Sequence, residues 1–449
     1  MDFADVIITF SYVMLITMFA LFYRQLNRHR LIYRKYFVAG LFAKIIGAIS
    51  FVSIYTFYYE YGGDASTYFH DAVILSNVIL TNPFDYIEIL ISSNEHVYEN
   101  FPEIVNATIY RPGQSEWFTS KFASIVTFFG LGNYLASTVI FASLSYIGVW
   151  SMFVTFSKRY PKITGNLAFA ILFVPSVFFW GSGISKDSIV IGFLGLLIYY
   201  ADRLILRKGI GKYPSILMIA LCSYIIFNTK AYVIMSLLPA IILWNIMSYR
   251  EKIGNPLIRR FIIPFLIAAM TFAMAGTIQF LGSYSEKYSI DNVLSTAQGM
   301  QSWHQVQTHL QHGNIGRGSS YTLGDYDETL LGILKMAPAS INVTLFRPYP
   351  TEVNSIVMAL ASFESMIILI ASIYVFIGLG LFRIPKIINR DAFLLMALSF
   401  SLFFAFAVGF SSYNFGALVR YKIPCIPLYI SALYILQHEA RLMKKRKLR

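Results

Sequence analysis

Long runs of apolar residues recur along the chain, and short polar or charged segments separate them. A helix crosses the hydrocarbon core of a bilayer in about 20 apolar residues, because each residue advances it by about 1.5 Å. The pattern therefore predicts an all-α polytopic transmembrane bundle of about eleven spans. The expected spans are 5–23, 37–59, 133–156, 165–182, 187–206, 214–229, 232–249, 260–281, 355–381, 391–411 and 423–437.

Two longer polar segments interrupt this pattern. Residues 60–116 and 282–354 are rich in aromatic residues, Gly and Pro, so we expect two ordered extracytoplasmic loops. Within them, 70–81 and 290–312 have amphipathic patterns that predict short helices at the membrane interface. The apolar segment 117–130 is too short for a full crossing, and we expect it to be re-entrant or interfacial.

Basic residues predict the orientation of these spans. The cluster after the first apolar run is typical of a stop-transfer flank and not of a signal-peptide cleavage site. Its members are Arg24, Arg28, Arg30, Arg34 and Lys35. By the positive-inside rule the N-terminus lies outside, and the basic tail 438–449 is cytoplasmic. We expect a single transmembrane domain over residues 1–449.

Composition narrows the class of protein further. Of the 449 residues, 57% are hydrophobic and only 13% are charged, whereas an average soluble protein has roughly 25% charged residues. This excludes a soluble globule and a disordered chain. The net charge of +13 arises mainly in the expected cytoplasmic segments, so it reports topology and gives no support for a nucleic-acid partner. Two cysteines cannot form a disulfide framework.

The first long loop begins with a candidate general base. Gly62 and Gly63 follow the second span and allow a tight turn close to a ligand. Asp64 comes next, at the membrane surface, where partial desolvation makes a carboxylate a better proton acceptor. The alternative is structural, with Asp64 as the N-cap of a helix over 65–80.

A second outward turn, in 178–188, has the features of an anion site. Ser185 is a candidate cap for the helix that follows, which places Lys186 in its first turn. A lysine beside the amides of a helix N-terminus suits phosphate or pyrophosphate. Asp187 would orient Lys186 or accept a proton. The alternative is a capped hairpin with an interfacial ion pair.

Three more outward cations lie near the ends of spans. Arg347 lies between Phe346 and Pro348, and its guanidinium matches phosphate oxygens bidentately. Lys230 and Arg420 would each be an interfacial anchor if considered alone, but with Lys186 and Arg347 they make four cations at outer ends. Glu364 lies inside a span, where a carboxylate needs a partner or a cavity, or stays neutral with a hydrogen-bonded partner.

The sequence predicts no metal site and no cofactor. His304, His309 and His312 share one polar stretch, but no cysteine or acid completes a familiar zinc spacing. We therefore expect solvated loop histidines.

Several motifs together resemble a known group of membrane enzymes. They are Gly-Asp-x-x-x-Tyr at 63–68, Glu-Trp at 116–117, Gly-Asn-Tyr at 132–134, Phe-Trp-x-x-Gly-x-x-Lys-Asp at 179–187, Phe-Arg-Pro-x-Pro at 346–350 and Asn-x-Gly-x-x-x-Arg at 414–420. In this order, with a long aromatic-rich helical core, the chain resembles bacterial enzymes of polysaccharide assembly, namely GT-C glycosyltransferases and Wzy-type or EpsG-type polysaccharide polymerases.

The resemblance implies a GT-C-like fold and transfer of a sugar or oligosaccharide from an undecaprenyl-(pyro)phosphate donor on the extracytoplasmic side. It implies that Asp64, with Asp187, is catalytic, and that Asp64 deprotonates the acceptor hydroxyl. The implied phosphate ligands are Lys186, Lys230, Arg347 and Arg420. The implied substrate-binding residues are Tyr68, Trp180, Glu352 and Glu364.

The resemblance also implies a multi-pass protein of the bacterial inner membrane. Its partners would be the lipid bilayer, a polyprenyl-(pyro)phosphate glycan and other polysaccharide-assembly proteins. Two other functions stay open. The same cations would suit a transporter or flippase of an anionic lipid-linked glycan, which is expected to have inverted repeats and broken midplane helices. A non-catalytic assembly protein would not need four outward cations.

Overall fold

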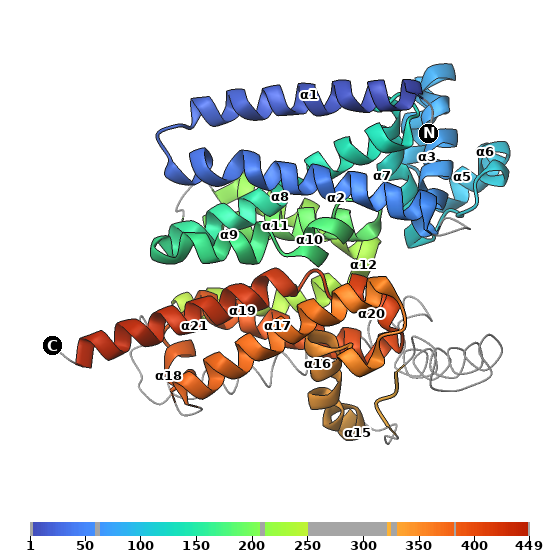
Figure 1. Ribbon diagram of the computed structural model, residues 1–449. Coiled ribbons are helices and arrows are strands. Elements are labelled where there is room, and N and C mark those ends of the chain that lie inside the picture. Colours follow the sequence, from blue (N-terminus) through green and yellow to red (C-terminus); the bar gives the residue numbers. More distant parts are fainter. Residues whose placement is uncertain are drawn as a thin grey trace. The chain divides into compact units, whose positions relative to one another are not determined.

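The computed structural model describes residues 3–58, 63–206, 212–249, 321–324, 330–380 and 383–447. Within these ranges every regular element is a helix, which confirms the all-α class (Figure 1). The α-helices are α1 Phe3–Leu26, α2 Val38–Phe57, α3 Asp64–Thr81, α4 Pro83–Ile91, α5 Asn94–Asn100, α6 Pro102–Ala107, α7 Ser115–Phe129, α8 Tyr134–Arg159, α9 Thr164–Leu172, α10 Pro175–Trp180, α11 Lys186–Leu206, α12 Tyr213–Ser248, α15 Leu330–Lys335, α16 Ala337–Phe346, α17 Ile356–Leu379, α18 Ile384–Ile388, α19 Ala392–Ser412, α20 Phe415–Tyr421 and α21 Ile426–Lys447.

The chain is a multi-pass membrane protein. Among the described residues, seven helices are long and apolar enough to cross a bilayer, and the bent pair α20–α21 makes an eighth if it is one span. They are α1, α2 with its preceding π-helical turn, α8, α11, α12, α17 and α19. The predicted span 260–281 and the predicted amphipathic helix 290–312 lie outside the described residues.

The predicted span 165–182 is wrong as a continuous helix. Its residues form two short helices, α9 and α10, and the break falls directly before Pro175. Proline lacks a backbone N–H and disfavours helical geometry at the residue before it. Val174 accordingly adopts extended dihedral angles, with φ −69° and ψ 122°.

The predicted spans 214–229 and 232–249 form the two parts of α12. This helix has 36 residues, which would span about 54 Å if straight, well beyond the roughly 30 Å of the hydrocarbon core. Lys230 interrupts it with non-helical dihedral angles, φ −146° and ψ 85°. The interruption falls where the sequence predicts a turn.

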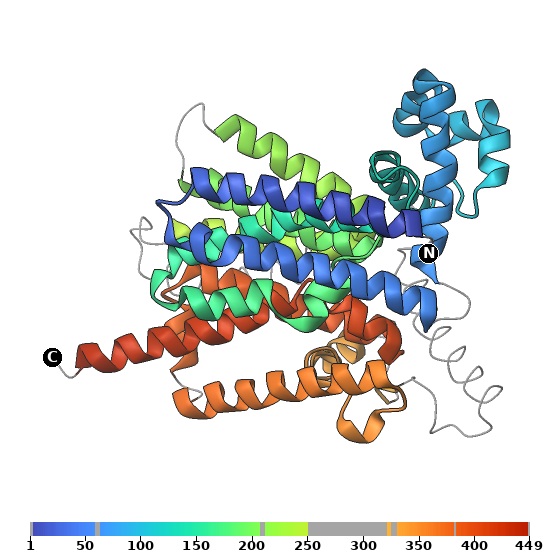
Figure 2. The ribbon, with the colours of Figure 1, turned by 45° about the horizontal axis from the view of Figure 1, so that its top comes forward.

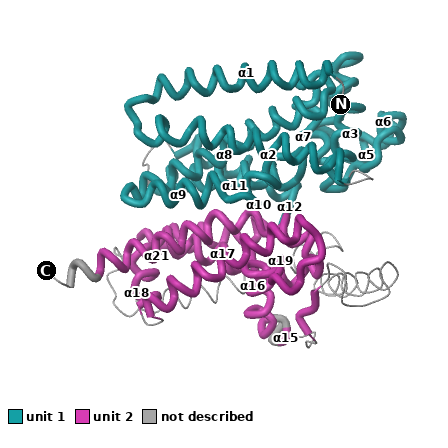
Figure 3. Tube along the Cα trace, viewed as in Figure 1, with its two compact units in different colours: residues 1–231 teal, residues 232–449 magenta. Residues whose placement is uncertain are grey.

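The chain, for which the sequence predicts one domain over 1–449, divides into two compact units, Met1–Ala231 and Tyr232–Arg449 (Figure 3). In unit 1, helix α8 packs against α1, α2 and α11. Glycines allow the closest of these approaches. A Cβ added at Gly148 would lie 1.7 Å from the carbonyl oxygen of Gly192, and one at Gly195 would lie 2.1 Å from that of Gly148. Small residues that bring backbones together are a common means of helix association in membranes.

Gly148→Ala is therefore expected to force α8 and α11 apart and to lower the free energy of unfolding by about 1–3 kcal/mol or more. Gly378→Ala is the matched control, since nothing lies within 4 Å of a Cβ at Gly378 in α17. Thermal unfolding of the detergent-solubilised variants measures both. Equal melting temperatures would show that the α8–α11 contact is not close in the membrane.

Helices α3–α7 form a separate module at one end of unit 1. In Figures 1 and 2, α3 lies crosswise to α1 and α2, at the end that carries the N-terminus. Helix α3 packs along α7, and Asn82 and Ser93 cap α4 and α5 with their side chains. The predicted amphipathic helix 70–81 is part of α3, and the short apolar segment 117–130 forms the 15-residue helix α7.

In unit 2, α19 packs against both α16 and α21. Gly409 of α19 permits the contact with α16, because a Cβ there would lie 2.1 Å from the carbonyl oxygen of Ser340. A bend of 63° separates α20 from α21.

Candidate functional site

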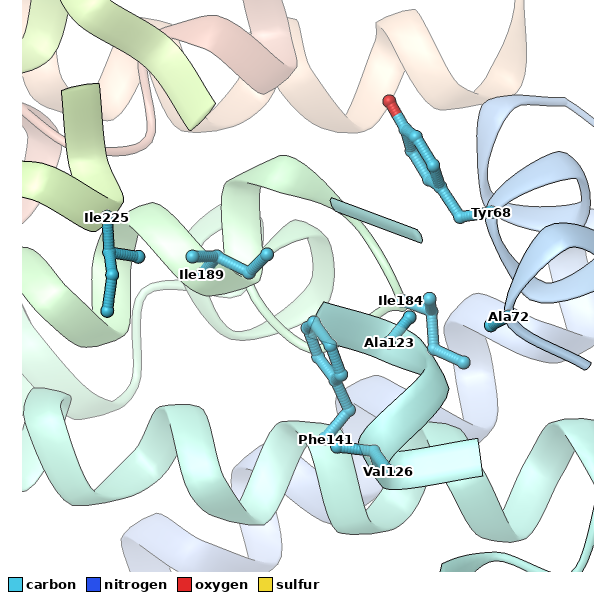
Figure 4. Close-up of a cluster of buried hydrophobic side chains, with 8 residues drawn as sticks. All are labelled: Tyr68, Ala72, Ala123, Val126, Phe141, Ile184, Ile189 and Ile225. Carbon is cyan, nitrogen blue, oxygen red and sulfur yellow. The ribbon is translucent and has the colours of Figure 1, made fainter. Parts of the chain in front are cut away.

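Five helices and the turn before α11 contribute side chains to one apolar cluster in unit 1 (Figure 4). Its buried members are Tyr68, Ala72, Ala123, Val126, Phe141, Ile184, Ile189 and Ile225. They come from α3, α7, α8, α11 and α12 and from the turn 181–185. This cluster fixes the starts of α3, α7 and α11 relative to the break in α12, and the charged residues described below lie at those positions.

The turn before α11 has the predicted cap. Ser185 is buried, and its hydroxyl accepts a hydrogen bond from the backbone N–H of Ser188 at 3.4 Å. The hydroxyl of Ser188 donates to the carbonyl oxygen of Gly183 at 2.7 Å. Lys186 is the first residue of α11, which confirms its predicted place in the first turn.

Lys186 forms an ion pair with the first turn of α7. Its Nζ lies 2.5 Å from Oε1 of Glu116 and 2.8 Å from the hydroxyl of Ser115. The ammonium is more buried than the carboxylate. Burial disfavours the charged form of Glu116, but the hydrogen bond and charge of Lys186 outweigh it and lower the pKa of Glu116 below its ordinary value.

The lowered pKa of Glu116 makes the stability of the protein depend on pH. Because the folded-state pKa of Glu116 lies below its ordinary value of 4.5, its stabilising contribution is present above pH 4.5 and is lost as the pH falls through the folded-state pKa. The melting temperature of the protein should therefore exceed that of Glu116→Gln near neutral pH, and the difference should shrink on acidification below 4.5. A difference that grew on acidification would contradict the pairing.

Asp187, the next residue, forms an ion pair with Lys230, which lies at the interruption in α12. Nζ of Lys230 lies 2.5 Å from Oδ1 of Asp187, and both side chains are buried. The sequence predicts that Asp187 orients Lys186 or accepts a proton. In the structure its ion-pair partner is Lys230, 43 positions along the chain, and its predicted roles stay predictions.

Asp64 is the first residue of α3 and is exposed. Gly63 is the N-cap, so the alternative in which Asp64 caps this helix is wrong. Gly63 has a φ of 151°, and a Cβ there would meet the ring of Tyr55 at 2.8 Å, so the turn requires glycine. Asp64 and Glu116 both act electrostatically on Tyr110. We call Asp64, Glu116, Lys186, Asp187 and Lys230 the carboxylate–lysine cluster.

Tyr110 lies near enough to the carboxylates of Asp64 and Glu116 for their charges to affect it. Burial, with the nearby charges of Asp64, Glu116 and Asp71, raises the pKa of Tyr110 to about 12. The phenol is therefore protonated at neutral pH and can donate a hydrogen bond. Its ring packs on Tyr68 with centroids 5.2 Å apart.

Asp71 fixes the backbone of the loop at Ile109 and Tyr110. The sequence did not identify it as a candidate site residue. Its carboxylate is fully buried and accepts hydrogen bonds from the backbone N–H groups of Ile109 at 2.8 Å and Tyr110 at 3.0 Å. A carboxylate 38 residues away satisfies the backbone of the loop. Nothing in the local pattern of α3 signals this contact.

Lys44 is a second residue that sequence analysis left without a role. It is buried in the middle of α2, and its Nζ donates to the carbonyl oxygen of Gly181 and, at 3.4 Å, to the hydroxyl of Ser145. The hydroxyl of Ser145 donates to the carbonyl oxygen of Ser188 at 2.8 Å. These bonds tie α2 and α8 to the turn that presents Lys186.

Two predicted substrate-binding aromatics do not offer exposed rings. Tyr68 is buried against Tyr110. Trp180 is buried at the end of α10, with Phe51 and Phe179 around it. Both side chains therefore take part in packing the module and the turn, and their implied role in substrate binding stays a prediction.

Unit 2 contains a separate group around Arg347. The guanidinium forms a fork with Glu352, in which Nε lies 3.0 Å from Oε2 and NH2 contacts Oε1. It also lies 5.6 Å, 5.8 Å and 5.1 Å from the ring centroids of Tyr321, Tyr349 and Phe415. The predicted phosphate ligand Arg347 and the predicted substrate ligand Glu352 are therefore direct partners.

Lys422 anchors the same segment. It is buried, and its Nζ donates to the hydroxyl of Ser365 at 2.7 Å and to the carbonyl oxygen of Arg347 at 3.3 Å. Glu364, half-buried in α17, lies within electrostatic reach of Lys422. The sequence indicates that Glu364 needs a partner but does not identify one. In the structure Lys422 is a cation near it. Arg420, half-buried, lies in the last turn of α20.

Among the described residues, no group of three or more His, Cys, Asp or Glu is placed to hold a metal ion. His304, His309 and His312 lie outside those residues. Comparison of the chain with family models, with curated proteins and with solved structures gives no match. The functional argument therefore depends on the geometry of the chain's own residues.

Proposed function

We propose that the protein is a glycosyltransferase or polysaccharide polymerase of the bacterial inner membrane. It transfers a sugar or oligosaccharide from an undecaprenyl-(pyro)phosphate donor to an acceptor hydroxyl on the extracytoplasmic side. The observation that carries this proposal is the carboxylate–lysine cluster of unit 1. In a membrane protein, it combines Lys186 and the exposed Asp64, each at the start of a helix, with a buried ion pair between Asp187 and Lys230.

Lys186 is the proposed ligand of the donor phosphate. Its position in the first turn of α11 adds an ammonium to the partial positive charge of the helix N-terminus. In the structure that ammonium donates a hydrogen bond to the carboxylate of Glu116. We propose that phosphate replaces the Glu116 carboxylate at Nζ, while Asp187 and Lys230 stay paired and hold the start of α11 in place.

Asp64 is the proposed general base. It accepts the proton of the acceptor hydroxyl as that oxygen bonds to the anomeric carbon of the donor. The bond between the anomeric carbon and the phosphate oxygen breaks, and its electron pair leaves with the polyprenyl (pyro)phosphate. Lys186 stabilises the charge that develops on this leaving group.

The predicted topology agrees with a reaction on the extracytoplasmic side of the membrane. The α3–α7 module lies at the end of unit 1 that carries the N-terminus (Figure 1). Asn133, before α8, donates to Asp5 of α1 at 2.7 Å. If the N-terminus is outside, as the basic residues predict, the cluster faces outward.

Matched variants of the Lys186–Glu116 pair test phosphate binding. Lys186→Gln should raise the Kd for undecaprenyl phosphate by about tenfold or more, which is about 1.4 kcal/mol of lost binding energy. Glu116→Gln should lower this Kd, because it removes the carboxylate that competes for Nζ. Native mass spectrometry of the purified protein with the lipid measures both.

A higher Kd for Lys186→Gln together with a lower Kd for Glu116→Gln would support the phosphate site. An unchanged Kd in both variants would overturn it. Equal weakening in both would mean that the pair maintains the fold without contacting phosphate, which also contradicts the proposal.

One observation favours transport as a second candidate function. Discontinuous helices are typical of transporters, and α12 is interrupted at Lys230, which pairs with Asp187. A flippase would move the lipid-linked glycan without forming a glycosidic bond. Detection of that bond with purified protein separates the two functions.

A further inference from the structure

A row of exposed apolar side chains runs along the end of α3 and along α4. It consists of Leu80, Phe84, Ile87 and Ile91, which are 73%, 82%, 52% and 79% exposed. Their spacing of three and four residues places those of α4 on one face of the helix. We call these four residues the α4 stripe. Such an exposed apolar face marks an interaction surface.

The opposite side of α4 is firmly packed. Tyr86 and Ile89 are buried there, and the hydroxyl of Tyr86 lies 2.8 Å from that of Ser124 in α7. Lys121 of α7 donates to the carbonyl oxygens of Leu90 at 3.2 Å and Ile89 at 3.5 Å, at the C-terminal end of α4. This packing fixes the direction in which the α4 stripe faces within the module.

The membrane surface is the occupant that the surroundings favour. The module connects at both ends to predicted spans, through α2 on one side and α8 on the other. Exposed apolar residues continue at both junctions, at Phe57 of α2 and at Phe129 and Leu131 before α8. Helix α3 lies crosswise to α1 and α2, which is the orientation of a helix parallel to the bilayer plane (Figures 1 and 2).

We propose that the α4 stripe inserts into the interfacial layer of the bilayer and seats the α3–α7 module on the membrane surface. The inserted face is apolar, and Glu88, hydrogen-bonded to His96 at 2.5 Å, borders it. This arrangement matches an interfacial amphipathic helix, whose apolar face enters the headgroup and acyl boundary. The proposal is independent of the chemistry assigned to the carboxylate–lysine cluster.

Site-directed spin labelling tests this surface. Both native cysteines, Cys222 and Cys425, are buried, so a label directed to a new surface cysteine reports that position. Phe84→Cys and Ile91→Cys probe the stripe. Glu95→Cys and Glu99→Cys, at exposed positions of α5, are the controls. Electron paramagnetic resonance in proteoliposomes then compares collision with oxygen, which concentrates in lipid, and with a water-soluble nickel chelate.

The labels at 84 and 91 should collide several-fold more with oxygen than with nickel, and the labels at 95 and 99 should show the reverse. Nickel accessibility at 84 and 91 equal to that of the controls would place the stripe in water and overturn the proposal. Labels at 84 and 91 that are immobilised and shielded from both reagents would show a protein partner, which also overturns it.

Discussion

Asp64→Asn is expected to lower the rate of glycosyl transfer by about 10²- to 10⁴-fold, the usual effect of removing a general base. Asparagine keeps the size of the side chain and can occupy the first turn of α3, so the fold should persist. Binding of undecaprenyl phosphate should not weaken, because Asp64 acts on the acceptor. Incorporation of labelled sugar into polymer, with the lipid-linked donor and purified protein, measures the rate.

Asp85→Asn is the matched control. Asp85 lies in the first turn of α4, as Asp64 does in α3, but outside the carboxylate–lysine cluster. Asp85→Asn should leave the rate within about twofold of that of the unmodified protein, since Asp85 is half-buried and lies outside the proposed site. A similar loss of rate in both variants would mean that removing a charge from the first turn of any helix in this module slows the reaction. The effect of Asp64→Asn would then not identify a general base. Full activity of Asp64→Asn would exclude this residue as the base.

Lys230→Met is expected to have the largest effect on stability, a loss of about 3–5 kcal/mol, because it leaves the carboxylate of Asp187 buried without its ammonium. The double variant Asp187→Leu with Lys230→Met removes both charges and should recover most of this loss, since apolar replacement of a buried pair is often neutral. Thermal or urea unfolding in detergent measures the differences.

Glu88→Gln provides the comparison for an exposed pair. Glu88 and His96 are in contact, and both side chains are partly exposed, at 46% and 40%, so their loss should change stability by at most about 1 kcal/mol. If Lys230→Met cost no more than Glu88→Gln, the Asp187–Lys230 pair would be hydrated and the interruption of α12 would have another cause. If the double variant were as unstable as the single one, coupling between the two side chains would be excluded.

The spans were the part of the fold that the sequence predicted best. Helices α1, α2, α8, α11, α17 and α19 lie within a few residues of the predicted segments, because about 20 apolar residues form a helix in a membrane regardless of distant contacts. The sequence predicts two spans joined by a turn at 230–231, and the structure has one helix, α12, that is interrupted there at Lys230. The continuous span 165–182 was wrong because the apolar count concealed the local effect of Pro175.

The contacts of the cluster could not be predicted in this way. Lys186 was expected beside phosphate because of its helix cap, which is a local feature. Its partner Glu116 is 70 positions away, and Asp187 and Lys230 are 43 positions apart. Only the packing of α3, α7, α11 and α12 on a common apolar cluster brings them together.

The buried polar residues were missed for a related reason. Asp71 and Lys44 each appear in the sequence as a single charge in a helical pattern. Their roles depend on backbone groups of other segments, namely the N–H groups of Ile109 and Tyr110 and the carbonyl oxygen of Gly181. For Lys44, a lone charge in an apolar run was the available signal, and it indicated a buried partner without identifying it.

The most direct test uses purified protein in proteoliposomes that contain an undecaprenyl-pyrophosphate oligosaccharide. The account predicts new glycosidic bonds and release of one undecaprenyl pyrophosphate for each bond, with both products formed about 10²- to 10⁴-fold more slowly by Asp64→Asn. Movement of the intact lipid-linked glycan across the bilayer with no new glycosidic bond would contradict the account and identify a transporter.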